Sequence, residues 1–247
     1  KGVEADPFRI FREHGANTVR VRLWHNPEWT KTLNNGTSYS DLADVIKTIR
    51  RAREAGMMVN LDLHYSDDWS DPAKQAVPKA WEGLALPVLK DSVYKYTLAV
   101  LNQLNLLGLV PEMVQVGNEN NNGIMFPVGK VINGDWSSFA SLINSGIDAV
   151  RDFSKTSSIK PRIIIHVAQL QNAFPWLKNL TAAGVTDFDI IGLSHYFKWS
   201  EVTSMQSISD TISAIRNKYG KEVMVVETAY PWTSLNADQY PNVISGS

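Results

Sequence analysis

The sequence predicts an α/β protein whose parallel strands form a barrel. Short apolar runs of strand length alternate with segments of helical periodicity along the chain, which indicates a parallel sheet covered by helices. Several runs carry polar residues on one face, although strands of such sheets are usually buried on both faces. A barrel explains this pattern, because its inner face widens into a pocket at the carboxyl ends of the strands. No linker divides residues 1–247, so we expect one domain.

Six strands and five main helices are expected in alternation. The strands lie near residues 19–24, 57–65, 112–118, 161–168, 188–196 and 222–227. The helices lie at about 40–55, 87–107, 136–153, 175–183 and 206–219. The clearest helix, 40–55, begins at Ser40-Asp41, repeats apolar residues at intervals of three and four, and stops at Gly56.

Successive side chains of a strand point to opposite faces, so the polar residues of the first two strands gather on one side. The residues expected on this inner face are Arg20, Arg22, Trp24, Asn60, Asp62 and His64. By the same rule Tyr196 shares its face with Ser194.

Two glutamates, Glu119 and Glu227, close strand-like runs and are followed by polar or turn-forming residues. Alternation places Glu119 on the face of Gln115 and Glu227 on the face of Val225. A carboxylate at the end of a buried strand is costly unless it is paired or useful, and α/β proteins build active sites at this edge. The pair suggests glycoside hydrolysis, which needs an acid and a nucleophile or base. The alternative is two structural ion pairs.

Composition excludes several classes of function. A net charge of -1 with 20% charged residues provides no basic surface for nucleic acid, and no apolar run approaches the roughly 18 residues of a membrane span. We therefore expect neither nucleic-acid nor membrane partners. The absence of cysteine excludes disulfides, thiolate zinc sites and thiol nucleophiles.

Four of the eight tryptophans fall at or just after strand ends: Trp24, Trp69, Trp199 and Trp232. Aromatic rings stack on the apolar faces of sugars, so this placement favours a binding surface, with core packing as the alternative. Trp69 and Trp232 are the predicted stacking residues.

Five strand-end motifs resemble those of one known family. They are VRVRLW at 19–24, DLHYSDDWSDP at 62–72, QVGNE at 115–119, DIIGLSHY at 189–196 and VVETAYPW at 225–232. They are similar to the signatures of the endo-β-1,4-galactanases, family 53 of the glycoside hydrolases, in order along nearly the whole chain. The resemblance implies a TIM-type (β/α)8 barrel, retaining chemistry, and the galactan side chains of pectin as substrate.

The resemblance also implies roles for individual residues. Glu119 would be the acid/base and Glu227 the nucleophile of a catalytic domain. Arg20 would keep Glu227 ionised, with a plain structural ion pair as the alternative, and Tyr196 would hydrogen-bond it.

Three further polar residues are expected at the sugar site. Asn118 would contact the hydroxyl next to the reacting carbon, which requires a kink or bulge at Gly117 because alternation turns its side chain away from Glu119. Asp62 and His64 would support the sugar site, or else belong to an interior hydrogen-bond network.

The same resemblance aligns the chain with strands two to seven of the family's eight. We therefore expect an open barrel with unpaired edges at 19–24 and 222–227, marginally stable and prone to association. Local departures are His195, where members often carry tyrosine, and the loop extended by residues 120–122.

Other functions remain open at this point. A metal-dependent hydrolase would use His64, His166 and His195 with Asp62, Asp67, Asp68 and Asp189, but no His-x-His or His-Glu-x-x-His pair appears. A non-catalytic sugar-binding protein is a third interpretation. We expect no cofactor, with calcium as an option only for the loop after Glu227. The expected partner is β-1,4-galactan, the full-length protein is expected to be a monomer, and such a polymer substrate implies a secreted, periplasmic or cell-surface location.

Overall fold

The computed structural model describes residues 2, 4–230, 233 and 235. Its main sheet has six parallel strands in the order β1-β2-β3-β6-β7-β8. Their bounds are β1 Thr18–Leu23, β2 Met58–Leu63, β3 Met113–Val116, β6 Arg162–Ala168, β7 Ile190–Ser194 and β8 Glu222–Glu227. All six predicted strands are present, and the predicted α/β class of the TIM-barrel type is confirmed.

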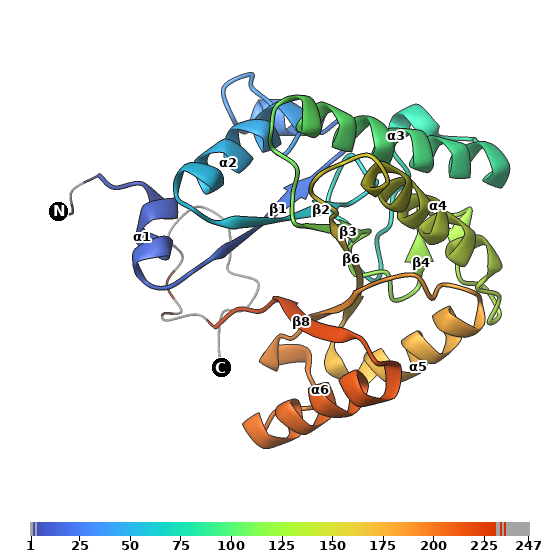
Figure 1. Cartoon of the computed structure of the whole chain (residues 1–247). Helices are drawn as coiled ribbons and strands as arrows, with labels where there is room; N and C mark the ends of the chain where they lie inside the picture. Colours follow the sequence, from blue (N-terminus) through green and yellow to red (C-terminus); the bar gives the residue numbers. More distant parts are fainter. Residues whose placement is uncertain (1, 3, 231–232, 234, 236–247) are drawn as a thin grey trace.

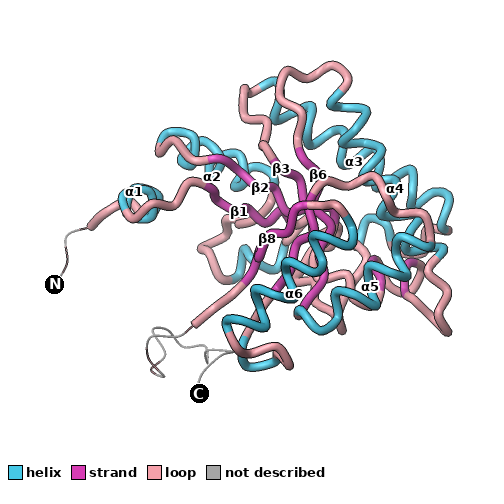
Figure 2. Tube along the Cα trace, turned by 60° about the horizontal axis from the view of Figure 1, so that its bottom comes forward, coloured by secondary structure: helices cyan, strands magenta, loops and turns pink. Residues whose placement is uncertain are grey.

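Six α-helices accompany these strands in the part of the chain that the structure describes. They are α1 Pro7–Glu13, α2 Leu42–Glu54, α3 Leu86–Leu106, α4 Ser137–Ser154, α5 Leu170–Ala182 and α6 Met205–Tyr219. Figure 1 shows α2 to α6 arranged around the outside of the strands, and the tube in Figure 2 shows the strands at the centre from a second direction. Short 3-10 helices lie at Glu28–Thr32, Lys79–Trp81 and Phe197–Trp199. Within the described residues, no helix combines the length and apolar character that crossing a membrane requires.

Helix boundaries follow local capping chemistry. The Asp41 carboxylate accepts the Asp44 backbone N–H at 2.9 Å and so begins α2, whose buried face carries Val45, Ile49 and Ala52. The helix expected at 175–183 is longer than predicted, since α5 begins at Leu170.

A small antiparallel hairpin follows β3 and was not predicted. It pairs β4, Gly123–Ile124, with β5, Gly129–Lys130. A Cβ on Gly123 would lie 2.1 Å from the Gly129 carbonyl oxygen, so the two backbones approach closely only because both residues are glycine. Strands of two residues are too short to show a periodic pattern.

The described residues form two apolar clusters. The larger lies between the sheet and the surrounding helices. The smaller lies toward the amino ends of the strands and contains Met113, Ile164 and Ile190 packed against Met224 and Val226. The sheet face that carries the second cluster is therefore apolar at its amino end, which leaves the carboxyl end of this face for polar groups.

The strands β1 and β8 are the two edges of the sheet among the described residues. β1, Thr18–Leu23, and β8, Glu222–Glu227, correspond to the edges expected near 19–24 and 222–227, and Figure 1 shows them at opposite ends of the sheet. Val225 of β8 is 41% exposed, which is unusual for an apolar residue of such a sheet.

Candidate active site

Glu119 lies just after β3, where the backbone changes direction. Gly117 has φ +84° and Glu119 has φ +47°, both in the left-handed region. A Cβ on Gly117 would lie 2.3 Å from Asn120 Oδ1, so the turn needs glycine for its conformation and for space. The predicted kink at Gly117 is observed, and it allows both Asn118 and Glu119 to reach the same polar network.

Gln75 holds this turn from a neighbouring loop. Its buried side-chain amide donates to the carbonyl oxygens of Asn118, at 2.8 Å, and Glu119, at 3.3 Å. The backbone N–H of Glu119 donates to His166 Nδ1 at 3.1 Å. Sequence reasoning missed Gln75, because nothing in a loop sequence shows which glutamine will meet a strained turn.

Glu227 reaches the site through an irregularity in β8. Leu193 pairs with Val225, but the next residue, Ser194, pairs with Glu227, so Val226 is an extra residue in the edge strand. This bulge turns the Glu227 carboxylate toward Arg20 and Tyr196. The expectation that Glu227 shares the face of Val225 is therefore wrong: Val225 is 41% exposed, whereas Glu227 contacts the interior.

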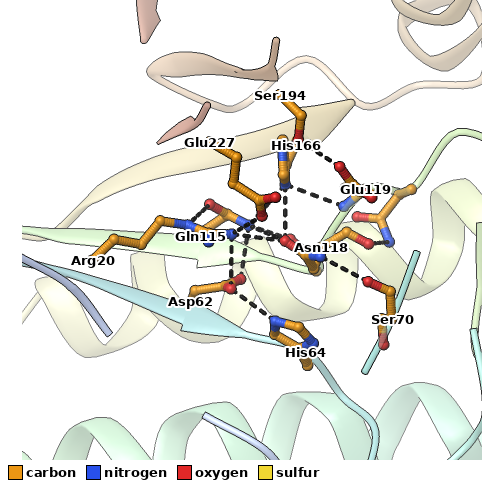
Figure 3. A network of polar contacts seen from close by, with 12 residues as sticks. Arg20, Asp62, His64, Ser70, Gln115, Asn118, Glu119, His166, Ser194 and Glu227 are labelled. Atoms are coloured by element: carbon orange, nitrogen blue, oxygen red, sulfur yellow. Dashed lines mark hydrogen bonds and ion pairs between the residues drawn. The ribbon is translucent and has the colours of Figure 1, made fainter. Parts of the chain in front are cut away.

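Arg20 enters the polar network drawn in Figure 3 from β1 and contacts several of its members. Its Nη2 lies 2.8 Å from Asp62 Oδ2 and 3.0 Å from Glu227 Oε1. The same nitrogen donates to Asn118 Oδ1 at 2.7 Å, and Nε donates to Gln115 Oε1 at 3.1 Å. The guanidinium is thus fixed by groups from three other strands or their ends, in the planar geometry that arginine provides.

Tyr196 completes the surroundings of Glu227. Its hydroxyl donates to Glu227 Oε2 at 2.9 Å, while Arg20 contacts Oε1. Burial raises the pKa of Tyr196 and the Glu227 charge adds to the rise, so the phenol remains protonated and available as a donor. Each oxygen of the Glu227 carboxylate is thus held by one donor.

Asp62 and His64 lie beneath this network and are fully or almost fully buried. His64 Nε2 lies 2.9 Å from Asp62 Oδ2, and Gln115 Nε2 donates to Asp62 Oδ1 at 2.7 Å. Burial acts to raise the pKa of Asp62, but the Arg20 guanidinium and His64 outweigh it and lower that pKa. Asp62 therefore keeps its charge and holds Arg20 in place.

His166 was named from the sequence only for the metal-dependent alternative, and Ser194 was not predicted as a site residue. His166 Nε2 lies 2.9 Å from Ser194 Oγ, which in turn donates to Glu119 Oε1 at 2.5 Å. The available signal was strand alternation, which puts Ser194 and Tyr196 on one face.

The two glutamates differ in their surroundings. One carboxylate oxygen of each lies within 4.8 Å of the other. Burial raises the pKa of Glu119 to about 7, the Glu227 charge adds to the rise, and the Ser194 hydroxyl opposes it. One carboxyl is thus suited to hold a proton near neutral pH while its neighbour is ionised.

One group of side chains among the described residues could gather around a metal ion: Glu119, His166 and Glu227. Both His166 nitrogens are already hydrogen-bonded, and Glu227 already contacts Arg20, so this group does not fit a metal site without breaking those bonds. The alternative set predicted around His64 and Asp189 is not assembled. Asp189 binds Arg151 and the backbone of Ile163 at the amino end of the sheet.

The strand-end tryptophans that the structure describes differ in exposure. Trp24 is fully buried, so its predicted place on a binding surface is wrong; it packs against the Arg22 guanidinium, 4.3 Å from the ring centroid. Trp69 is 50% exposed and covers the other side of Arg22, at 3.8 Å, and Trp199 is 46% exposed. Trp232 lies outside the described residues.

Comparisons with known proteins agree on one family. The model described as Glycosyl hydrolase family 53 matches residues 1–247. The chain is 47% identical over 247 residues to "Arabinogalactan endo-beta-1,4-galactanase" of Cellvibrio japonicus, covering 99% of the chain and 64% of that protein. It is 34% identical over 241 residues to "Endo-beta-1,4-galactanase" of Bacillus subtilis, covering 98% of the chain and 54% of that protein.

A solved structure supports the same assignment. The "Ignisphaera aggregans GH53 catalytic domain" is similar with a TM-score of 0.87 at 34% identity, covering 99% of this chain and 66% of that one. The chain thus spans less than two thirds of the length of these relatives.

Proposed function

The chain belongs to glycosyl hydrolase family 53, and from this membership we propose that it performs retaining endo-hydrolysis of β-1,4-galactosidic bonds. The substrate is galactan or the type I arabinogalactan side chains of pectin. The relatives named above are called galactanases, and the motifs at the strand ends support the same substrate class.

The spacing and protonation of Glu119 and Glu227 carry this proposal. Retaining glycosidases keep their two carboxyl groups roughly 5–5.5 Å apart, whereas inverting ones leave about 6.5–9.5 Å for a water. Oxygens of Glu119 and Glu227 lie within 4.8 Å of each other, which fits direct attack on the sugar.

The reaction follows from the two environments. Glu227, contacted by Arg20 and Tyr196, attacks the anomeric carbon as a carboxylate, and the bond to the departing oxygen breaks. Glu119 gives its proton to that oxygen. Glu119, now a carboxylate, then takes a proton from water, which attacks the glycosyl ester and releases Glu227.

The remaining polar residues serve the sugar. Asn118, fixed by Arg20 Nη2 and by its own donation to the Ser70 carbonyl at 2.8 Å, contacts the hydroxyl next to the reacting carbon. Asp62 and His64 support the site from beneath. Trp69, with half of its surface exposed, stacks on a sugar face, and Trp232 is proposed for the same role.

The cellular setting follows from the substrate. A polysaccharide of this size is met outside the cytoplasm, so the protein acts in a secreted, periplasmic or cell-surface location. It works as a single catalytic domain and a monomer in its full-length form, without a cofactor. The loop after Glu227, where calcium was an option, lies mostly outside the described residues.

Product analysis tests the proposed function. The full-length protein is incubated with β-1,4-galactan, mannan and cellulose, with and without EDTA, and the anomeric configuration of the first product is followed by NMR. We expect galactan to be cleaved internally, with β products and no effect of EDTA. Binding without cleavage would favour the sugar-binding alternative, and complete loss with EDTA would favour a metal-dependent hydrolase.

A further inference from the structure

We propose that His166 and Ser194 form a fixed hydrogen-bond chain that positions the Glu119 carboxyl and leaves Oε2 as the atom that carries the acid proton. This inference rests on the proposed function. Both residues are fully buried, so they act through Glu119 and not on the sugar.

The direction of this hydrogen-bond chain follows from the groups around His166 Nδ1. The Glu119 N–H donates to Nδ1 at 3.1 Å, and Gln115 Nε2, which also donates to Asp62 Oδ1, lies 3.1 Å from it. Asn118 Oδ1 also lies 3.1 Å from Nδ1, but it already accepts from Arg20 Nη2 at 2.7 Å, so the two donors decide that Nδ1 carries a lone pair. Burial, with Arg20 nearby, holds the pKa of His166 well below its usual value, so the ring is neutral and its one proton lies on Nε2.

Ser194 accepts a hydrogen bond from His166 and donates one to the Glu119 carboxyl. Since His166 Nε2–H donates to Ser194 Oγ at 2.9 Å, the serine proton is free to point to Glu119 Oε1, 2.5 Å away. An oxygen that accepts this bond is the carbonyl oxygen of the protonated acid. The acid proton is thus on Oε2.

His166 holds Glu119 at two points, the backbone N–H and, through Ser194, the side chain (Figure 3). This double contact matters because Glu119 has φ +47°, a conformation that non-glycine residues adopt only when the surroundings stabilise it. The chain thus keeps the acid group at the end of a turn that would otherwise relax.

The Ser194 bond has a different strength in the two steps of the reaction. A hydroxyl donates more strongly to a carboxylate than to a neutral acid, so it stabilises Glu119 after the proton has left. Loss of the bond should raise the pKa of Glu119, because the Ser194 hydroxyl acts to lower it. The other charged or titratable groups around the chain are Arg20, Asp62, His64, Asp71, Tyr196 and Glu227.

Replacing Ser194 by alanine removes the hydrogen bond without removing a charge. In the full-length protein, we expect Ser194→Ala to lower kcat/KM on β-1,4-galactan roughly 10- to 100-fold, as expected for one hydrogen bond to a charged group. The alkaline limb of the kcat/KM profile should move to higher pH. On dinitrophenyl β-galactobioside, whose leaving group needs no proton, kcat/KM should stay within about threefold of wild type.

Three controls separate positioning from general damage. Ser145→Ala removes another mostly buried serine hydroxyl, which donates to the Ser141 carbonyl oxygen of its own helix, and should change neither substrate's kcat/KM. Ser194→Thr keeps the hydroxyl and should recover part of the galactan activity. Nitrogen-15 NMR of the wild-type protein should show His166 protonated on Nε2, a measurement that does not depend on any variant folding.

Two results would contradict the proposed hydrogen-bond chain from His166 through Ser194 to Glu119. An Nδ1–H tautomer of His166 would do so, as would an equal loss on both substrates with an unmoved alkaline limb. Failure of the proposed function is a separate outcome, because the wild-type protein would then leave galactan uncut, or Glu119→Ala would remain active.

Discussion

Arg20 Nη2 lies 3.0 Å from Glu227 Oε1, and this ion pair joins β1 and β8, the two edge strands of the sheet. Both side chains are only about one-fifth exposed. Asp62 on the neighbouring strand contacts the same nitrogen at 2.8 Å, so the guanidinium is shared between two carboxylates. Arg20 therefore places its guanidinium beside the Glu227 carboxylate while Asp62 holds it from the other side.

Replacing the nucleophile should leave a defect that azide can repair. Glu227→Ala should abolish galactan cleavage, because no ester can form. Azide fits the space of the lost carboxylate and should restore turnover of an activated aryl galactoside, with an inverted galactosyl azide as product. NMR of the product gives the configuration. In the matched variant Glu119→Ala, azide should give a retained product. The same configuration from both variants would contradict the assignment of Glu227 as nucleophile and Glu119 as acid/base.

The activity should fall in alkaline solution as Glu119 loses its proton. With a pKa of about 7, the alkaline limb of kcat/KM should lie near pH 7. The charge of Glu227 contributes to this value, so Glu227→Gln should lower the pKa of Glu119. Carbon-13 NMR of the labelled carboxyl measures this directly, and an unchanged titration would show that the two glutamates are not coupled.

Ionisation of Glu119 should lower the free energy of unfolding. The pKa of Glu119 is raised from 4.5 to about 7 in the folded protein. The contribution of Glu119 to the free energy of unfolding is therefore complete below pH 4.5 and is lost as the pH rises to 7. Glu119→Gln removes this loss, and we expect it to stabilise the protein by at most about 3 kcal/mol above pH 7 and progressively less toward pH 4.5. Denaturant unfolding at several pH values measures this difference. A gain that did not depend on pH would contradict the titration.

Gly117 should tolerate no side chain. Gly117→Ala would force alanine into φ +84° and bring Cβ within 2.3 Å of Asn120 Oδ1. We expect a loss of roughly 2–4 kcal/mol in unfolding free energy, and lower activity in the fraction that folds. Gly36→Ala is the control, since Gly36 has φ +82° with nothing within 4 Å of its Cβ position. Equal losses in both variants would mean that crowding at the turn has no effect.

Two neighbouring tryptophans should respond in opposite ways. Trp24→Ala empties a fully buried site and should cost roughly 3–5 kcal/mol of stability. Trp69 is half exposed, so Trp69→Ala should cost little stability but raise KM for galactan about tenfold through the lost stacking. Thermal unfolding and steady-state kinetics separate these effects. A Trp69→Ala protein with unchanged KM would remove Trp69 from the binding surface.

The strand-end residues were the most predictable part of the site. Strand periodicity and the rule that α/β sheets place function at their carboxyl edge were enough to bring Glu119, Arg20 and Tyr196 to one place. The same rule failed for Val225 and Glu227, because a bulge in β8 changes the alternation within one residue. It also failed for Trp24, since a strand-end position does not reveal how much surface neighbouring loops will cover.

The sequence by itself determined the α/β class, the six strands and the pair of glutamates, because periodicity and strand-end chemistry are local properties of the chain. Only the tertiary structure decided which groups control that pair. Gln75, His166 and Ser194 come from separate segments and meet Glu119 only after the strands have paired. Their effect depends on distances of about 3 Å and on burial, and both arise from the packing of segments that are far apart in the sequence.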